Sequence, residues 1–174
     1  HVQVHRGTAA GSATVVGNDN FLMATSHVGH NCRVGDAVVL ANGALLGGYV
    51  EVGKNVFISG NCLVHQFVRI GTLALMQGGS AISKDLPPYC VALRENEICG
   101  LNVIGLKRAG FSKERLAAIE QAYDLVQRAA MQTWQAKHAG QPDADFLQQP
   151  QHALGPGIVE MMDLEHGTGT VGWG

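Results

Sequence analysis

The sequence is short of charge, aromatic rings and proline. Only 15% of the residues are charged and 6% are aromatic, whereas an average globular domain is about 25% charged. No apolar stretch approaches the roughly 18 residues of a membrane-spanning helix, and no secretory signal peptide opens the chain. We therefore expect a cytoplasmic protein without membrane insertion.

The chain also has little net charge and lacks closely spaced pairs of cysteines. The formal net charge is −2 at pH 7, so no basic patch indicates a nucleic-acid partner. The four cysteines lack the close paired spacing of zinc knuckles and small disulfide scaffolds. By contrast, the chain contains 23 glycines and is 46% hydrophobic. This composition excludes disorder and indicates many tight corners between short aliphatic strands.

Aliphatic side chains recur at every sixth position in the first half of the chain. They are Val16, Leu22, Val28, Val34, Leu40, Leu46, Val52, Ile58, Val64, Ile70, Met76 and Ile82. An α-helix would scatter a period of six around its surface. In a strand, the residue two positions earlier lies on the same face, and it is small or modest here, as at Cys32 and Ala44. The period predicts a parallel β-helix with three hexapeptides in each coil.

Glycine often follows the aliphatic residue, as at Gly29 and Gly47, where we expect either a positive φ or a crowded backbone. The repeat stops at Pro87 and Pro88, which cannot donate to a strand ladder. We therefore divide the chain into a β-helix at 1–88 and a connector with an α-helical C-terminal region at 89–174.

The C-terminal region is expected to contain one long helix and a short one. Ser112 has the character of an N-cap, and an apolar stripe with alternating spacings of three and four follows it. The stripe consists of Leu116, Ile119, Tyr123, Val126, Ala130 and Trp134. The helix should end near Lys137, and a short helix is possible at 157–165.

Histidines gather at positions that the coil register brings together. His30 and Gln66 lie two coils apart on the same corner, with Tyr49 in the coil between them. A single groove could be lined by His5, His27, His30, Tyr49, His65 and Gln66. A neutral imidazole can take a proton from a hydroxyl that attacks a thioester. Asn31 could hold the tautomer of His30 through its amide oxygen.

A second group of polar residues precedes the long helix. Lys107 and Arg108 could bind the phosphates of a nucleotide, with Asn102 donating or accepting a hydrogen bond nearby. A solvated basic pair is the alternative for Lys107 and Arg108 considered by themselves.

Six stretches carry a resemblance to a known family. They are HRGT (5–8), NDNFLM (18–23), HVGHNC (27–32), VHQFVRIG (64–71), DLPPY (85–89) and NVIGLKRAGFS (102–112). In this order they resemble the UDP-N-acetylglucosamine O-acyltransferases that begin lipid A synthesis, over about residues 1–135. The resemblance implies a left-handed β-helix and a homotrimer with active sites between subunits. It also implies transfer of a 3-hydroxyacyl group from acyl carrier protein to the sugar 3-position of UDP-N-acetylglucosamine, without metal or cofactor.

The same resemblance implies roles for individual residues. His30 matches the general base, and Gly78 falls where the family measures acyl-chain length. The matching substrate-binding positions are His5, His27, His65, Gln66, Asn102 and Arg108.

The chain also departs from the family pattern. Asn31 stands where the family usually has an aspartate, Tyr49 replaces a cleft histidine, and Ile104 replaces an acidic residue. The family's earlier coils are absent, so we expect a fragment or trimmed chain whose first residue lies partway into the β-helix.

Three alternatives stay open at this point. The chain could be another hexapeptide-repeat acyltransferase, such as the N-acyltransferase of the same pathway or an acetyl-CoA enzyme. It could be a zinc protein like the γ-type carbonic anhydrases, although no further histidine follows His65 closely. It could also be a non-catalytic scaffold left after loss of the upstream coils.

Overall fold

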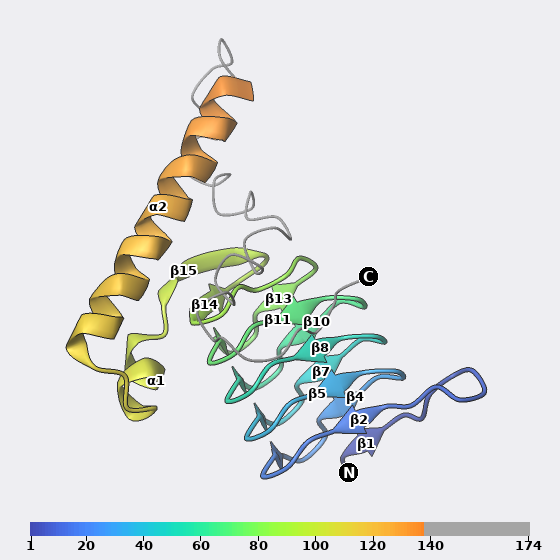
Figure 1. Ribbon diagram of the computed structural model, residues 1–174. Helices are drawn as coiled ribbons and strands as arrows, with labels where there is room; N and C mark the ends of the chain where they lie inside the picture. Colours follow the sequence, from blue (N-terminus) through green and yellow to red (C-terminus); the bar gives the residue numbers. More distant parts are fainter. Residues whose placement is uncertain (138–174) are drawn as a thin grey trace.

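The protein is a stack of triangular coils with helices at its C-terminal end, and the computed structural model describes residues 1–137 (Figure 1). The possible helix at 157–165 lies outside the described residues. The first sheet runs β1 (Gln3–Val4), β4 (His27–Val28), β7 (Leu45–Leu46), β10 (Leu63–Val64) and β13 (Ala81–Ile82). The second sheet runs β2 (Val15–Val16), β5 (Arg33–Val34), β8 (Glu51–Val52) and β11 (Arg69–Ile70). The third runs β3 (Phe21–Leu22), β6 (Val39–Leu40), β9 (Phe57–Ile58), β12 (Leu75–Met76), β14 (Cys90–Leu93) and β15 (Glu97–Leu101).

The predicted parallel β-helix of hexapeptide repeats is confirmed. From β1 to β14, each strand pairs in parallel with the strand one coil away, as His27 does with Leu45 and Leu45 with Leu63. The aliphatic positions from Val28 to Ile82 are at most 5% exposed. Val16 is 36% exposed because it lies in the first coil, which has a neighbour on one side only. The interior is therefore one continuous apolar column.

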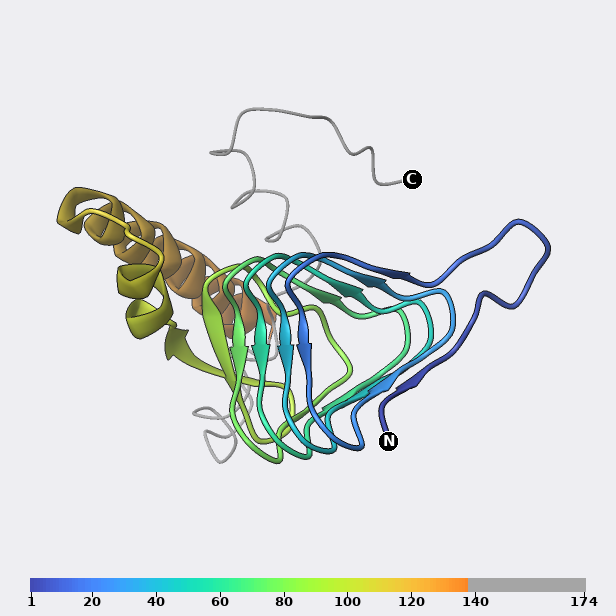
Figure 2. The same cartoon turned by 90° about the horizontal axis from the view of Figure 1, so that it is seen from below.

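The first coil carries a loop that leaves the stack. Gln3 pairs with His27, so this coil is one hexapeptide longer than those that follow. The extra residues form the connection between β1 and β2, which projects beyond the triangular outline (Figure 2). A turn closes this loop, because Ser12 Oγ accepts from the Ala9 N–H at 2.9 Å. Gly7 allows the close approach, since a Cβ there would lie 2.4 Å from the Ser12 carbonyl oxygen.

Positive φ angles occur at the corners, three residues after the aliphatic position. The non-glycine residues concerned are Asp19, Thr25, Asn31, Ala37, Tyr49, Asn55, Asn61, Phe67 and Leu73. This conformation costs a non-glycine residue roughly 1–2 kcal/mol. From Ala37 onward, the N–H of each such residue donates to a carbonyl of the preceding coil, as Tyr49 does to His30 O at 2.9 Å. The glycines directly after the aliphatic residues serve close approach instead, since a Cβ at Gly29 would lie 2.6 Å from the backbone of Gly47.

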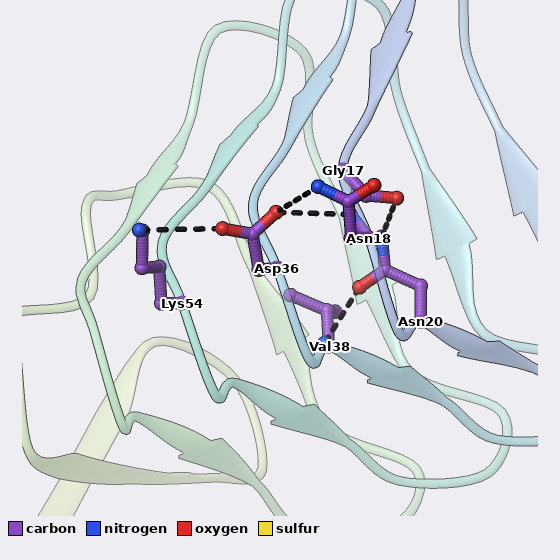
Figure 3. A network of polar contacts seen from close by, with 6 residues as sticks. All are labelled: Gly17, Asn18, Asn20, Asp36, Val38 and Lys54. Atoms are coloured by element: carbon purple, nitrogen blue, oxygen red, sulfur yellow. Dashed lines mark hydrogen bonds and ion pairs between the residues drawn. The ribbon is translucent and has the colours of Figure 1, made fainter.

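Polar side chains also link successive coils at a corner, as Figure 3 shows. Asp36 Oδ1 accepts from the backbone N–H of Asn18 at 2.9 Å, and its other oxygen pairs with Lys54 Nζ at 3.2 Å. The bond from Asn18 and the ammonium of Lys54 hold the pKa of Asp36 below its usual value. In the next turn, Asn20 donates to Gly17 O at 3.0 Å and accepts from Val38 N at 2.7 Å. These contacts keep neighbouring coils in register.

The stack continues past the predicted boundary at residue 88. Leu86 bridges Ile70, and β14 pairs in parallel with β12. Asp85 fastens this last coil, because both of its oxygens accept from Arg69, with the shortest contact 2.7 Å long. The antiparallel strand β15 then turns back against β14. Instead of the plain connector expected after residue 89, the structure contains a hairpin, and the division at 88 stays a prediction.

Two helices follow the hairpin: α1 (Val103–Arg108) and α2 (Lys113–Lys137). The prediction of Ser112 as N-cap is confirmed, because its hydroxyl accepts from Arg115 N at 3.3 Å. The residues of the predicted stripe from Leu116 to Ala130 are buried or pack on the apolar clusters, whereas the side chain of Trp134 lies outside the described part. Neither helix in residues 1–137 has the length and apolar character that spanning a membrane requires.

Candidate active site

His30 lies at the corner that follows β4, and its imidazole is held from one side. Its Nδ1 lies 3.0 Å from the amide oxygen of Asn31. That amide oxygen also accepts from the backbone N–H of Thr8 at 3.2 Å. Because an N–H can only donate, the Asn31 atom facing His30 is the oxygen, and Nδ1 must carry the proton. The lone pair of the ring is therefore on Nε2, the nitrogen that can take a proton from a bound hydroxyl.

Two neighbours from the next coil define the space around the His30 ring. Gly48 lies directly against it, since a Cβ at Gly48 would lie 2.5 Å from His30 Cε1. The ring of Tyr49 meets the imidazole edge to face, with centroids 5.3 Å apart. Tyr49 in turn stacks on Phe67 at 4.9 Å, and both aromatic side chains are exposed. Gln66 follows in the same column as His30 and Gly48, because Phe67 N donates to Gly48 O at 3.0 Å.

His5 and His27 form a second pair beside this corner. Their ring centroids are 4.7 Å apart and the planes are nearly perpendicular. Burial lowers the pKa of His27 below its ordinary 6.5, and repulsion from the neighbouring imidazole of His5 lowers it further. His27 therefore stays neutral at physiological pH and can accept or donate a hydrogen bond.

A groove of about 360 Å³ lies on the first sheet next to these histidines. It is lined by the apolar side chains of Leu45 and Leu63 and by the polar residues His27, His65, Ser83, Glu95 and Asn96. Gly47 also lines this groove, so His30, which lies against Gly48, is at its edge. His65 Nδ1 donates to the Gln66 carbonyl oxygen at 3.2 Å, which leaves Nε2 as its acceptor nitrogen.

Asn102 and Arg108 lie on a different face of the molecule. They line a groove of about 800 Å³ formed by the third sheet and α1. Asn102 is only 8% exposed, and its amide is occupied by the protein. Its Nδ2 donates to Leu73 O at 2.8 Å, and its Oδ1 accepts from Gly105 N at 3.0 Å as the N-cap of α1. Asn102 thus has a structural role, while Arg108 is exposed; a substrate contact by either residue stays a prediction.

Gly78 is exposed at the corner between the third and first sheets. A Cβ at Gly78 would have its nearest neighbour, Gly60 O, at 3.7 Å, an ordinary contact distance. The position therefore has space for a larger side chain, as a residue that sets acyl-chain length would need. Its role stays a prediction.

Within a single chain, the structure brings His5, His27, His30, His65 and Gln66 to one side of the first sheet. Two residues around His30 were not predicted from the sequence: Gly48, which lies against its ring, and Thr8, which hydrogen-bonds to Asn31. Thr8 lies in the HRGT stretch, but its partner Asn31 is 23 residues away. Gly48 had a visible signal, because the doublet Gly47-Gly48 is longer than the single glycine of most repeats. Among residues 1–137, no group of three or more His, Cys, Asp or Glu side chains is placed to hold a metal ion.

Comparisons with known proteins identify relatives of this chain. A family model for the second domain of UDP-N-acetylglucosamine O-acyltransferase matches residues 85–162, and one for the bacterial transferase hexapeptide matches residues 13–48. The chain is 39% identical over 152 residues to the acyl-[acyl-carrier-protein]–UDP-N-acetylglucosamine O-acyltransferase of Anaeromyxobacter sp. (strain K), covering 83% of the chain and 59% of that relative. It is a homologue of the UDP-N-acetylglucosamine O-acyltransferases.

Two further acyltransferases of this name extend the comparison. That of Burkholderia mallei (strain SAVP1) is 40% identical over 136 residues, which are 77% of this chain and 52% of that one. The structure of the Francisella novicida UDP-N-acetylglucosamine acyltransferase superposes with a TM-score of 0.71 at 30% identity, covering 95% of this chain and 54% of its own. The chain thus spans little more than half the length of the curated acyltransferases that it matches.

Proposed function

We propose that this chain is an acyltransferase of lipid A biosynthesis. It moves a 3-hydroxyacyl group from acyl carrier protein to the 3-hydroxyl of UDP-N-acetylglucosamine. The observation that carries the proposal is the state of His30, whose Nδ1–H is engaged by Asn31 while Nε2 keeps its lone pair. Homology to proteins named for this reaction supports the choice of donor and acceptor over a zinc-dependent activity.

In the proposed mechanism, His30 is the general base. Its Nε2 removes the proton of the sugar hydroxyl as that oxygen attacks the thioester carbonyl carbon. The new C–O bond gives a tetrahedral intermediate, which collapses by breaking the C–S bond. The imidazolium returns its proton to the leaving thiolate, so the products are the acylated sugar nucleotide and the thiol of acyl carrier protein. Asn31 accepts from Nδ1–H throughout and stabilises the imidazolium less strongly than a carboxylate would.

The histidines around the base suit a polar acceptor sugar. His27 and His65 line the groove, where their rings can hydrogen-bond hydroxyl groups, and His5 adjoins His27. Gln66 lies in the corner column of His30. The apolar side chains of Leu45 and Leu63 in this groove suit a hydrocarbon chain. We assign sugar binding to these histidines and acyl binding to Leu45 and Leu63, with Gly78 setting the length of chain accepted.

A homotrimer would complete the site. In one chain Arg108 and the groove of the third sheet lie on a different face from His30. If the first sheet of one subunit faces the third sheet of the next, Arg108 can bind the nucleotide phosphates next to the base. Analytical ultracentrifugation should give three times the mass of the chain.

The test is transfer of a labelled 3-hydroxyacyl group from acyl carrier protein to UDP-N-acetylglucosamine. We expect the wild type to form product and His30→Ala to lose about 10²–10⁴-fold in kcat, with an unchanged thermal midpoint. His1→Ala is the matched control, because His1 lies outside both grooves. If His30→Ala forms product at the wild-type rate, the assignment of His30 as the general base is refuted. A folded wild type that transfers nothing, in the presence or absence of zinc, would refute the proposed reaction.

A further inference from the structure

The loop between β1 and β2 is fastened to the residue that holds His30. Thr8 gives Asn31 Oδ1 two hydrogen bonds, from its backbone N–H at 3.2 Å and from its hydroxyl at 3.0 Å. At the other end of the loop, Thr14 Oγ1 accepts from the backbone N–H of Asn31 at 2.8 Å. Residues at both ends of the projecting loop therefore hydrogen-bond to Asn31.

The orientation of this amide decides which nitrogen of His30 carries the proton. A carboxylate would offer an acceptor oxygen in either orientation, but an amide offers oxygen on one side and NH₂ on the other. If the Asn31 amide turned over, its NH₂ would face Nδ1 and would need the ring lone pair there. The proton would then move to Nε2, and the nitrogen that faces the substrate could no longer accept one.

The two donors of Thr8, its backbone N–H and its hydroxyl, disfavour this rotation of the Asn31 amide. Its backbone N–H has no acceptor capacity, so an NH₂ group in place of Asn31 Oδ1 would meet a donor. Because the Thr8 hydroxyl donates its hydrogen to Asn31, its oxygen accepts from the Tyr49 hydroxyl at 3.5 Å. Tyr49 packs its ring on His30, so the hydrogen-bonded chain runs from Tyr49 through Thr8 and Asn31 back to the imidazole.

We propose that Thr8 is a positioning residue for catalysis: it keeps the Asn31 amide oxygen turned toward His30 and so selects the imidazole tautomer with a free Nε2. The inference rests on the proposed function for its kinetic consequence, whereas the tautomer itself is a property of the free protein. Thr8 becomes necessary because residue 31 is an asparagine; with an aspartate there, the same loop contact would be dispensable.

The tautomer is measured directly from the ¹⁵N chemical shifts of the His30 ring in the full chain at pH 8. The wild type should have its proton on Nδ1. Thr8→Val, which removes the hydroxyl and keeps the shape, should raise the fraction protonated on Nε2. Thr8→Ser should retain the wild-type spectrum. Ser12→Ala is the control for general loop disturbance, since Ser12 bonds within the loop to Ala9, and it should also leave the spectrum unchanged.

The kinetic arm compares Thr8→Val in two backgrounds. With Asn31 we expect kcat to fall about three- to tenfold at constant KM, the loss that corresponds to one hydrogen bond. With Asn31→Asp the same substitution should change kcat less than about twofold, because either carboxylate oxygen can accept from Nδ1–H. An equal loss in both backgrounds, or an unchanged tautomer in Thr8→Val, would overturn the inference. Absence of transfer by the wild type would refute the proposed function, while the ¹⁵N spectra would still decide the role of Thr8.

Discussion

The imidazole of His30 lies directly against Gly48, one coil further along the stack. A Cβ on Gly48 would approach His30 Cε1 to 2.5 Å, closer than any ordinary contact. Gly48 does not need to be glycine for its backbone, since it is not among the residues with positive φ. The absence of a side chain at Gly48 therefore sets the place of the proposed base.

Gly48→Ala should displace the His30 ring and lower kcat. A misplacement of about 1 Å costs on the order of 10²-fold in rate, so we expect a loss of about ten- to hundredfold in the acyl-transfer assay. Gly60→Ala is the matched control, because Gly60 has the same place in its repeat and its nearest contact would be Asn42 O at 3.4 Å. Equal activity of the two variants would contradict this account of Gly48.

Substitutions of Asn102 and Arg108 should separate stability from binding. Asn102→Ala removes the N-cap of α1 and leaves the Leu73 carbonyl without its amide donor. We expect the free energy of unfolding to fall by about 1–3 kcal/mol, measured by denaturant titration. Arg108→Ala should leave this free energy unchanged and raise KM for the sugar nucleotide. A raised KM for Asn102→Ala at full stability would show that its amide serves the substrate instead.

Gly78 offers a test of acyl-chain selection. Its corner has space for a side chain, since a Cβ added there would lie 3.7 Å from Gly60 O, so Gly78→Met should fold normally. We expect the preferred donor to become shorter by several carbons, because the methionine would fill the end of the acyl site. Rates with a set of 3-hydroxyacyl donors of different length measure the shift. Retention of the wild-type rate with the shortest donor is the internal control, and an unchanged donor preference would remove Gly78 from the site.

The pair of His5 and His27 should make stability depend on pH. Because burial and His5 lower the pKa of His27 in the folded protein, the unfolded chain binds this proton more readily. The stability that His27 contributes is therefore fully present above about pH 6.5, its pKa in the unfolded chain. It is lost as the pH falls through the lower pKa of the folded protein. The thermal midpoint of the wild type should fall more between pH 7 and pH 5 than that of His27→Gln. His5→Gln should give an intermediate loss, and identical pH profiles for all three proteins would contradict the shift.

Much of the fold could be predicted from the sequence because a β-helix is built from contacts at fixed separation. The period of six places Val28, Leu46 and Val64 in one column once the coil length is known. The stripe of α2 follows from the helical period in the same way. The hairpin of β14 and β15 was missed, since a bulge interrupts its pairing between Val91 and Ala92 and hides the alternation of a regular strand.

The candidate site was predictable only in part. The register identified His30 and Gln66 as members of one corner column, since both follow the aliphatic position by two residues. The sequence could not decide whether the Asn102 amide binds a ligand or caps a helix, because asparagine does both. The contacts of Asn102 with Leu73 O and Gly105 N show that it caps a helix, while a substrate contact by Asn102 stays a prediction.

The amino-acid sequence by itself determined the coils, their aliphatic interior and the alignment of the histidines, because each depends on a local period repeated along the chain. Only the tertiary structure decided that Thr8 hydrogen-bonds to Asn31 and that the His30 ring lies directly against Gly48. Those contacts depend on the path of a projecting loop and on side-chain geometry between coils. The period places Gly48 one coil from His30. It encodes neither the loop path that brings Thr8 to Asn31 nor the close approach of the imidazole to Gly48.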